Sequence, residues 1–521
     1  MTGYVLVERL AGSRPLRAAA HAALARYARR RVETLDRLDV AGAQRRALLK
    51  LVRHARDTRF GREHDFAGVR SVADYQARVP LRTYEAFWAD YWGPTFPRLE
   101  GSTWPDVVPY FAQSSGTTTG HTKHIPVTRE MVRSNRKAAL TLTALYLAAH
   151  PGTPLLNGRA FFLGGSTDLR PLANGSLAGD LSGISAREVS AALRPYTFPP
   201  PDLALVADWE RKVDLLAERS AGLPVTLVSG VPAWLLTLFD RLRAATGKDR
   251  LIDVWPTLRV VVHGGCRFDP YRQTFRDVIG SDRVRLLDTY PSSEGYVATE
   301  DPRHGLLRLI PDHGIFFEFV PVGELSADRP TRHTAATVEP GVQYAVVLTT
   351  CAGLWSYVLG DTVCFEQRDP PLMRFTGRTK YFLSAFGEHL IGEEVERAVA
   401  AAAVAAGAEV LDFHVGPVFP TRPAEPGRHR YLVEFTRPPA DVGRFAAALD
   451  EELKALNSTY RDYRAGGVSL GPPEVLAVPA GGFAAWMASR GKAGGQHKVP
   501  RMDGTGQVTA ELTAWLGDRG L

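Results

Sequence analysis

The sequence predicts an α/β protein with two domains of unequal size. Short apolar runs alternate with helical segments from residue 106 to about residue 370, a pattern typical of strands joined by helices. The chain has 521 residues, more than one ordinary domain, and 45% of them are hydrophobic. We therefore expect a large, multi-layer N-terminal domain at residues 1–376 and a small, mobile α+β domain at residues 377–521.

Residues 1–105 are expected to form a helical part of the large domain. Arginine, alanine and leucine recur at helical spacing in residues 14–59, and aromatic residues follow in VADYQARVPLRTYEAFWADYW. The segment LRAAAHAALARYARRR could also form a helix on a membrane surface. We favour a helix with a solvated charged face that covers a core.

The alternating region contains six expected strands. They are RAFFLGG (159–165), PVTLVSG (224–230), LRVVVHGG (258–265), RVRLLDTY (283–290), GIFFEFVPV (314–322) and QYAVVLTT (343–350). The expected helices are REMVRSNRKAALTLTALYLAAH, DWERKVDLLAERSA and VPAWLLTLFDRLRAAT. Ligands of such folds bind at the loops that leave the strand ends.

The small domain is expected to begin after the turn RDPPL (368–372), with a hinge near Gly377. The segment RFTGRTKYFLSAFGEHLIGEEVERAVAAAAVAA predicts a strand, a hairpin and a helix. HRYLVEFTRP then predicts a strand, and VGRFAAALDEELKALNSTYRDYR predicts a second helix.

Charge and cysteine content narrow the class of protein. The net charge is only +7, and we treat the basic residues as scattered, so we expect no nucleic-acid partner. Cys266, Cys351 and Cys364 form no CxxC pair, which favours a reducing cytoplasm. The longest apolar run, at 398–408, is too short to span a bilayer, so we expect a cytoplasmic protein with no membrane partner. The oligomeric state is not indicated.

Residues 114–123, SSGTTTGHTK, have the composition of an anion-binding loop. Glycines allow a close backbone approach, hydroxyl and N–H groups donate to oxygens, and Lys123 adds a positive charge. The loop follows VVPYF and precedes a helix expected to begin near Thr128, so helix N–H groups could point at a phosphate. It is not a Walker loop, and a plain serine- and threonine-rich loop is the alternative.

Two further stretches carry candidate carboxylates. TYPSSEG (289–295) follows a strand and offers an aromatic ring for a base and Glu294 for a magnesium ion. YVLGD (357–361) places Asp361 after an expected glycine turn, where a carboxylate can accept both ribose hydroxyls. Each stretch taken alone could be an ordinary turn.

Two basic stretches lie in or beside the small domain. GRTKYFLSAFGEHL (377–390) places Arg378 and Lys380 at the expected domain boundary. GQHKVPR (495–501) places Lys498 in a glycine-flanked segment, which could also be a mobile tail.

In this order the stretches resemble the adenylate-forming superfamily, and more closely the Gretchen Hagen (auxin-responsive) family of acyl acid amido synthetases. The residues that carry the resemblance lie between about residue 80 and residue 505. They are SSGTTTGHTKHIPVT, SGVPAWLLTLFDRL, LRVVVHGG, YPSSEG, GRTKYFLSAFGEHLIGEEVERAV, LNSTYRDYR and QHKVPR. The resemblance implies a large domain that binds ATP and a small domain that rotates over it.

The resemblance also implies a set of nucleotide-binding residues. They are Ser114, Ser115, Gly116, Thr117, Thr118, Gly120, Lys123, Gly264, Gly265, Thr289, Tyr290, Ser293, Asp361 and Arg378. The residues from Ser114 to Lys123 would cradle the phosphates, and Asp361 and Arg378 would hold the ribose. Tyr290 would lie against adenine, with Gly264 and Gly265 as the backbone wall of its slot.

Glu294 and Lys498 are the expected catalytic residues by the same resemblance. Glu294 would bind Mg²⁺, and Lys498 would be the mobile lysine that reaches the carboxylate and the α-phosphate. Two positions depart from the pattern: many plant relatives have a lysine where this chain has His389, and Thr122 stands where proline is common.

The resemblance implies an ATP- and Mg²⁺-dependent ligase that joins a small carboxylic acid to an amine or amino acid through an acyl-AMP. An acyl-CoA or acyl-carrier-protein ligase that uses the same first step is the alternative. A non-catalytic sensor of nucleotide or acyl acid is a third hypothesis. It would need a damaged site, whereas Glu294, Asp361, Arg378 and Lys498 are all present.

Overall fold

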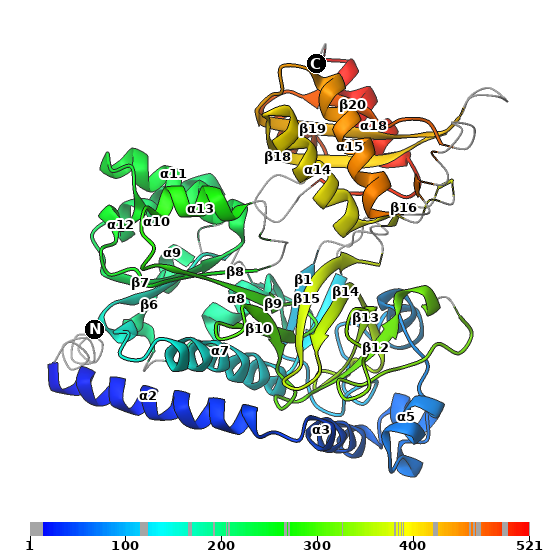
Figure 1. Cartoon of the computed structure of the whole chain (residues 1–521). Coiled ribbons are helices and arrows are strands. Elements are labelled where there is room, and N and C mark those ends of the chain that lie inside the picture. The colour runs from blue at the N-terminus through cyan, green and yellow to red at the C-terminus, as the bar shows by residue number, and fades with distance from the viewer. Residues whose placement is uncertain are drawn as a thin grey trace. The chain divides into compact units, whose positions relative to one another are not determined.

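The chain separates into two compact units. The computed structural model describes residues 14–114, 123–164, 169–190, 193–204, 206, 209–264, 268, 271–325, 327–379, 382–383, 385–386, 388, 390–419, 426–457, 460–461, 464, 470–491 and 499–519. Unit 1 comprises Met1–Leu359 and Val363–Phe375, and unit 2 comprises Gly360–Thr362 and Thr376–Leu521. The expected α/β class, with a large N-terminal and a smaller C-terminal part, is confirmed (Figure 1).

From residue 14 to residue 92 unit 1 is largely helical, and side chains cap several of these helices. These elements are α2 (Arg14–Asp36), α3 (Val40–Ala55), α4 (Arg59–Glu63), η1 (Phe66–Gly68), α5 (Val72–Arg78), α6 (Tyr84–Phe87) and the π-helix η2 (Trp88–Trp92). Asp39, Ser71 and Thr83 each accept a hydrogen bond from a backbone N–H of the following first turn, which satisfies a donor that the helix itself leaves unpaired.

An eleven-stranded mixed sheet forms the centre of unit 1, and unit 2 takes the inner stretch Gly360–Thr362 of β14 and the end of β15 from Thr376. In spatial order its strands are β12 (Ile315–Pro321), β13 (Gln343–Thr350), β14 (Tyr357–Gln367), β15 (Leu372–Arg378), β11 (Leu306–Leu309), β10 (Tyr296–Asp301), β9 (Arg285–Pro291), β8 (Val260–Gly264), β7 (Val225–Gly230), β3 (Arg159–Phe162) and β6 (Thr197–Phe198). The pairs among β6, β3, β7, β8 and β9 are parallel.

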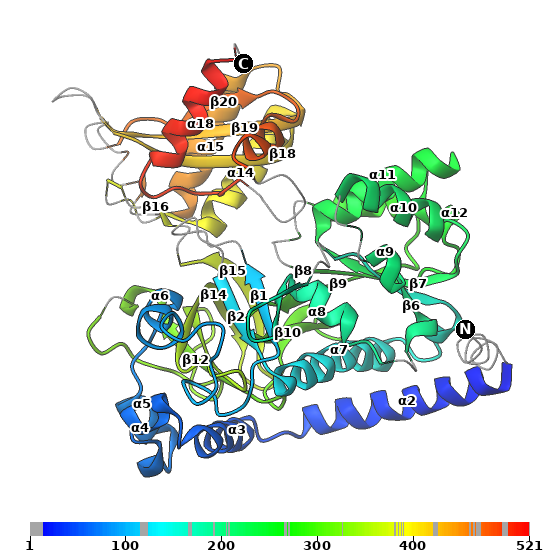
Figure 2. The same cartoon turned by 180° about the vertical axis from the view of Figure 1, so that it is seen from behind.

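Helices cover both faces of this parallel part (Figures 1 and 2). The helices of the region are α7 (Arg129–Ala149), η3 (Leu155–Asn157), α8 (Leu181–Arg187), η4 (Arg194–Tyr196), α9 (Pro201–Ala204), α10 (Trp209–Ser220), α11 (Pro232–Thr246), α12 (Leu251–Val254), α13 (Arg272–Ile279) and η6 (Val322–Glu324). Val261 of β8 packs toward α10–α13, whereas its neighbours Val260 and Val262 pack toward α7. This alternation makes three layers, because successive side chains of a strand point to opposite faces.

A second, four-stranded sheet contains Ser114 and Lys123, the first and last residues of the hydroxyl-rich segment. Its order is β2 (Lys123–Val127), β1 (Tyr110–Ser114), β5 (Leu177–Gly179) and β4 (Arg170–Pro171). The helix expected near Thr128 is present, but a strand that was not expected lies between the loop and this helix. The segment KHIPV pairs antiparallel with β1, so the loop joins two strands, and α7 begins only after its N-cap Thr128.

Unit 2 is a small α+β domain. Its elements after β15 are β16 (Phe382–Leu383), β17 (Leu390–Ile391), α14 (Gly392–Ala406), β18 (Glu409–Val418), β19 (Arg428–Arg437), α15 (Val442–Leu456), β20 (Glu474–Val478), α17 (Gly482–Ser489) and α18 (Gln507–Gly517). In β19, Tyr431 and Val433 pack with α14 and α15, and Leu432 packs with α17 and α18 on the other face. The sheet therefore has helices on both faces.

Helix α2 packs along α7 through Ala28 and Val32. A buried ion pair reinforces this contact, because Arg31 donates two hydrogen bonds of 2.6 and 2.7 Å to Asp312. Lys137 of α7 donates to the same carboxylate at 2.9 Å. The two cations outweigh the effect of burial, which alone would raise the pKa of Asp312, and lower that pKa to about 2.

We expect Asp312→Asn to lower the free energy of unfolding by about 3 kcal/mol at pH 7, because two cations lose their counter-charge. A carboxylate whose folded pKa is depressed stabilises the protein above its unfolded pKa, and that contribution is lost as the pH falls through the folded pKa. The difference between parent and variant should therefore shrink between pH 4 and pH 2, as followed by urea unfolding with tryptophan fluorescence. The exposed Asp328→Asn is the control, and a difference that does not change with pH would contradict the prediction.

Within the part of the chain that the structure describes, no helix combines the length and the apolar composition needed to cross a membrane. A cytoplasmic location stays a prediction.

Candidate functional site

The end of the β1–β2 hairpin places Lys123 directly opposite Ser114. The Nζ atom of Lys123 lies 3.9 Å from Oε1 of Glu85 and 5.0 Å from the centroid of the Tyr84 ring, and the side chain is 17% exposed. The lysine that follows the hydroxyl-rich loop is thus held beside a carboxylate and an aromatic face from α6.

Tyr84 ties α6 to the hairpin, because its hydroxyl accepts a hydrogen bond of 2.9 Å from the backbone N–H of His124. Burial raises the pKa of Tyr84 to about 12, so the phenol stays neutral at physiological pH. The imidazole of His124 lies between the rings of Trp88 and Phe96, at 6.2 and 5.0 Å. Packing therefore fixes the hairpin end against the helical part of unit 1.

Glu294 sits in a tight turn after β9. Ser292 and Gly295 close the turn: the Ser292 hydroxyl donates to the Gly295 carbonyl at 2.8 Å and accepts from the Gly295 N–H at 3.2 Å. The Glu294 side chain is 9% exposed, and its Oε1 accepts a hydrogen bond of 3.0 Å from the Tyr357 hydroxyl. Burial, followed by the charge of Glu294, raises the pKa of Tyr357 well above its usual value, so the hydroxyl remains a donor.

A backbone bridge brings α6 close to this carboxylate. Arg82 donates its N–H to the Ser356 carbonyl at 3.0 Å and accepts from the Val358 N–H at 2.8 Å. Phe87 of α6 packs against Tyr357, with the two ring centroids 6.2 Å apart, and the negative charge of Glu85 adds to the burial that raises the pKa of Tyr357. Lys123 and Glu294 therefore belong to one cluster in unit 1.

Sequence reasoning missed three members of this cluster: Tyr84, Glu85 and Tyr357. The first two lie in a segment that was assigned to aromatic packing. Tyr357 begins the motif YVLGD, where only the aspartate had been considered. The initial tyrosine of that motif was the available signal.

The strand ends next to the Glu294 turn are close-packed. Gly264 of β8 is the register partner of Thr289 of β9, and a Cβ atom at Gly264 would lie 2.5 Å from the Thr289 carbonyl oxygen. The Thr289 hydroxyl donates to the His263 carbonyl at 2.9 Å. Tyr290 is 6% exposed, and its ring packs edge-on against Phe375 at 5.4 Å. Only glycine fits at position 264 without a shift of its neighbours.

Ser293 is half-buried in the same turn, between Ser292 and Glu294. Thr289, Tyr290, Ser293 and Glu294 thus follow one another through a single strand end and turn, while Gly264 lies on the adjacent strand. The predicted adenine and metal residues of unit 1 are neighbours in the fold.

In unit 2, Asp361 is 5% exposed. It was expected after a glycine turn, but it lies inside β14, where Gly360 adopts a φ of 88°. That φ is accessible to glycine and strained for other residues. The hydroxyl groups of Thr362 and Thr376 share a hydrogen bond of 2.9 Å between β14 and β15, so Asp361 and Arg378 stand on adjacent strands.

Several predicted site residues lie outside the described part of the chain. They are Ser115, Gly116, Thr117, Thr118, Gly120, Gly265 and Lys498, together with Thr122, Lys380 and His389. For Ser114 and Arg378, the structure describes only the strand positions.

The donor set around Glu294 is compatible with Mg²⁺. Among the described residues no group of three or more histidine, cysteine, aspartate and glutamate side chains forms a metal-binding arrangement. Magnesium in nucleotide enzymes is bound by one or two carboxylates together with substrate phosphates and water, so a single buried carboxylate fits this use.

Comparisons with known proteins cover most of the chain. Three family models match in order: the GH3 family N-terminal domain at residues 34–284, the GH3 family central domain at 308–378 and the GH3 family C-terminal domain at 393–505.

Two of the curated relatives, both plant proteins, illustrate the match. The chain is 30% identical over 289 residues to the indole-3-acetic acid-amido synthetase GH3.3 of Arabidopsis thaliana, a match that covers 51% of this chain and 47% of that protein. Only about half of that relative is therefore matched. A probable indole-3-acetic acid-amido synthetase, GH3.1 of Oryza sativa subsp. japonica, is 24% identical over 563 residues, covering 90% of this chain and 88% of the relative.

Two solved structures have the same fold. The GH3.15 acyl acid amido synthetase superposes with a TM-score of 0.76 at 19% identity, covering 93% of this chain and 94% of the other. A 2-hydroxyisobutyryl-CoA ligase with bound 2-HIB-AMP gives a TM-score of 0.58 at 14% identity, covering 92% and 91%. At these identities the likeness concerns the fold alone.

Proposed function

Because this chain belongs to the GH3 family, we propose that it is an ATP-dependent ligase that forms amides. It activates a small carboxylic acid as an acyl-AMP and then transfers the acyl group to an amine or an amino acid. The matched Arabidopsis thaliana relative is named as a synthetase of this kind, which supports the proposal. The observation that carries it is the single cluster that joins Lys123 to the buried, hydrogen-bonded Glu294.

The chemistry explains why such a cluster is needed. A carboxylate is a poor acyl donor, so one of its oxygens first attacks the α-phosphorus of ATP, and the bond to pyrophosphate breaks. The amine nitrogen then attacks the acyl carbon, AMP leaves, and the nitrogen loses a proton. Both steps concentrate negative charge at phosphate oxygens, so positioned opposite charges accelerate them.

The residues of unit 1 have distinct roles in this proposal. Lys123 supplies positive charge to the phosphates that the loop beginning at Ser114 cradles. Glu294 would hold Mg²⁺, which when bound would neutralise developing charge on the phosphate oxygens. Tyr357 fixes the rotamer of Glu294 through its hydrogen bond, which keeps the carboxylate in place before nucleotide arrives. The remaining nucleotide contacts come from Gly264, Thr289, Tyr290 and Ser293.

Unit 2 contributes the residues that the family pattern assigns to a rotating domain. In the proposal Asp361 and Arg378 hold the ribose, Gly377 serves as the hinge, and Lys498 approaches the reacting carboxylate during adenylation. Gly377 has a φ of 142°, a backbone conformation that favours glycine over other residues.

Two assays test the proposed function. First, the protein is incubated with ATP, Mg²⁺, labelled pyrophosphate and a panel of aromatic and aliphatic acids, and acid-dependent exchange of label into ATP is measured. Second, each acid that supports exchange is incubated with ATP and an acceptor. One series contains amino acids and amines, the other contains CoA, and the products are identified by mass spectrometry. Amide products support the proposal, and thioesters formed in place of amides favour the acyl-CoA ligase. ATP binding without exchange for any acid would point to a sensor.

A further inference from the structure

The positive charge of the chain is concentrated in helices α2 and α3. The expectation that the basic residues are scattered was wrong. Residues 14–55 contain eleven arginine and lysine residues and three aspartate and glutamate residues, a net charge of +8, whereas the whole chain has +7. The rest of the molecule is therefore close to neutral, and α2 and α3 carry the excess.

The inner faces of these helices are buried in the core of unit 1. Ala28, Val32 and Leu35 of α2 and Leu48 and Leu51 of α3 are buried. The expected solvated face over a core is therefore confirmed for α2. Neither helix has an apolar side left over to insert into another partner.

The outer faces of both helices carry exposed arginine and lysine side chains. We define the cationic face as seven exposed side chains: Arg26, Arg29, Arg30, Arg37, Arg46, Lys50 and Arg53. None of them forms a side-chain hydrogen bond or ion pair with another described residue, in contrast to Arg31 and its partner Asp312. Such unpaired charges produce a strong local potential.

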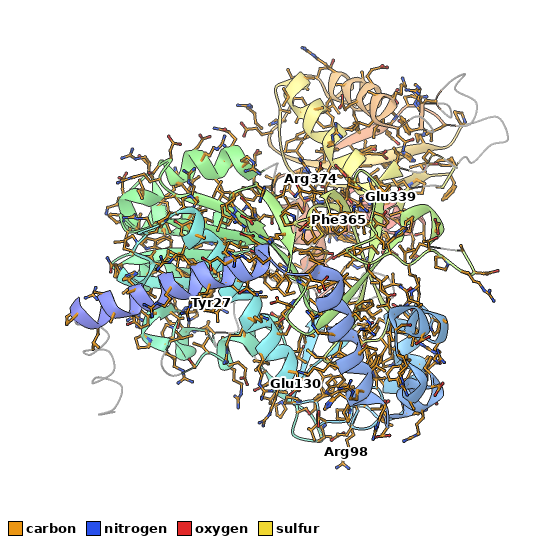
Figure 3. The ribbon with its side chains drawn as sticks, turned by 60° about the horizontal axis from the view of Figure 1, so that its bottom comes forward. Tyr27, Arg98, Glu130, Glu339, Phe365 and Arg374 are labelled. Carbon is orange, nitrogen blue, oxygen red and sulfur yellow. The ribbon has the colours of Figure 1, made fainter. Side chains whose placement is uncertain are left out.

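The two helices follow each other on one face of unit 1. Figures 1 and 2 show α2 leading into α3 along this face, and Figure 3 turns it toward the viewer, with Tyr27 marking α2. With 23 and 16 residues, the helices extend roughly 35 and 24 Å. The cationic face is therefore long compared with a site for one small anion.

We propose that the cationic face is a docking surface for the anionic headgroups of a phospholipid bilayer. Polybasic clusters of this size on amphipathic helices bind anionic lipid, at about 1 kcal/mol per basic residue near the surface. With the apolar sides of both helices buried, adsorption is electrostatic and does not involve insertion. The inference is independent of the proposed function, because it concerns a face made of none of the candidate site residues.

Two other polyanions fit the observations less well. Single-stranded nucleic acid is held by basic grooves with aromatic stacking platforms, and Tyr27 is the one Phe, Tyr or Trp residue between positions 14 and 55, where it is half-buried. Stable protein interfaces need buried apolar or aromatic anchors. Among the exposed large apolar side chains of the described structure, Leu16 alone belongs to these helices. A bilayer requires neither feature.

The test is sedimentation of the full chain with vesicles made of three parts phosphatidylcholine and one part phosphatidylserine. We expect binding that is absent with pure phosphatidylcholine and that is lost on raising the salt from about 50 mM to about 500 mM, because screening weakens exposed charges. The combined variant Arg26→Gln, Arg29→Gln and Arg30→Gln should bind about 100-fold more weakly. The variant Arg46→Gln, Lys50→Gln and Arg53→Gln should lose a similar factor.

A matched variant separates the face from net charge alone. Arg276, Arg397 and Arg444 are exposed elsewhere in the chain, and replacing all three by glutamine changes the total charge by the same amount. This control should bind vesicles like the parent. Equal losses in all three variants, no binding to anionic vesicles at low salt, or tight binding to duplex DNA or RNA without vesicle binding would each overturn the proposal. Acyl-AMP formation should be unchanged in every variant, so the result does not depend on the enzyme assay.

Discussion

Replacing Lys498 by alanine should lower the acid-dependent exchange of pyrophosphate into ATP by about 10²–10³-fold. In the proposed function this lysine neutralises charge at the carboxylate and the α-phosphate as the acyl-AMP forms. No other step uses it. Amide formation from a chemically prepared acyl-AMP should therefore stay within about threefold of the parent, since the amine attacks an adenylate that already exists.

Lys492 provides the matched control for this prediction, because it lies six positions earlier in the same glycine-rich segment. Lys492→Ala removes the same charge and should keep exchange at the parent level. Equal losses in the two variants would mean that the segment needs basic charge but no particular lysine. Undiminished exchange in Lys498→Ala would remove Lys498 from the mechanism and leave the family assignment intact.

The elements that could be predicted from sequence are those with a local signal. The runs around Val225, Val260 and Gln343 are strands as expected, because apolar stretches of this length between turn residues have few alternatives. Helix α7 also begins where its N-cap Thr128 predicts. Motif order along the chain led to the family, and the matches to its three domain models confirm that assignment.

The features that were missed depend on contacts between distant segments. The segment KHIPV was not expected to be a strand, and it is one because pairing with β1 satisfies its backbone groups. Tyr357 meets Glu294 across 63 positions, and the bridge from Arg82 to Tyr357 brings Glu85 to the same place. Neither the periodicity nor the spacing of the residues in the sequence predicts contacts between such distant segments. Likewise, the overall charge of +7 does not indicate that most of the excess positive charge lies in α2 and α3. The burial pattern then places these cations on the outer faces of the two helices.

Glu294→Gln should reduce the rate of acyl-AMP formation by about 10²-fold or more and should raise the Mg²⁺ concentration needed for half-maximal rate. Glutamine has the same shape and can still accept the hydrogen bond from Tyr357, so the turn between Ser292 and Gly295 should keep its structure. The substitution removes the negative charge that makes binding of Mg²⁺ at this position favourable. The measurement is the exchange rate across a Mg²⁺ titration at fixed ATP.

Tyr357→Phe separates the position of that carboxylate from its charge. The variant keeps Glu294 ionised but removes a donor to a buried charged acceptor, an interaction of about 1.5–3 kcal/mol, so we expect a loss of roughly tenfold to 100-fold with a smaller shift in Mg²⁺ requirement than in Glu294→Gln. Tyr344→Phe is the matched control, because that buried hydroxyl accepts a hydrogen bond from the Glu339 N–H and touches no candidate site residue. If Tyr344→Phe and Tyr357→Phe lose the same activity, the effect is one of stability. If Glu294→Gln leaves the Mg²⁺ dependence unchanged, the metal is held elsewhere and the proposed role of the turn after β9 is wrong.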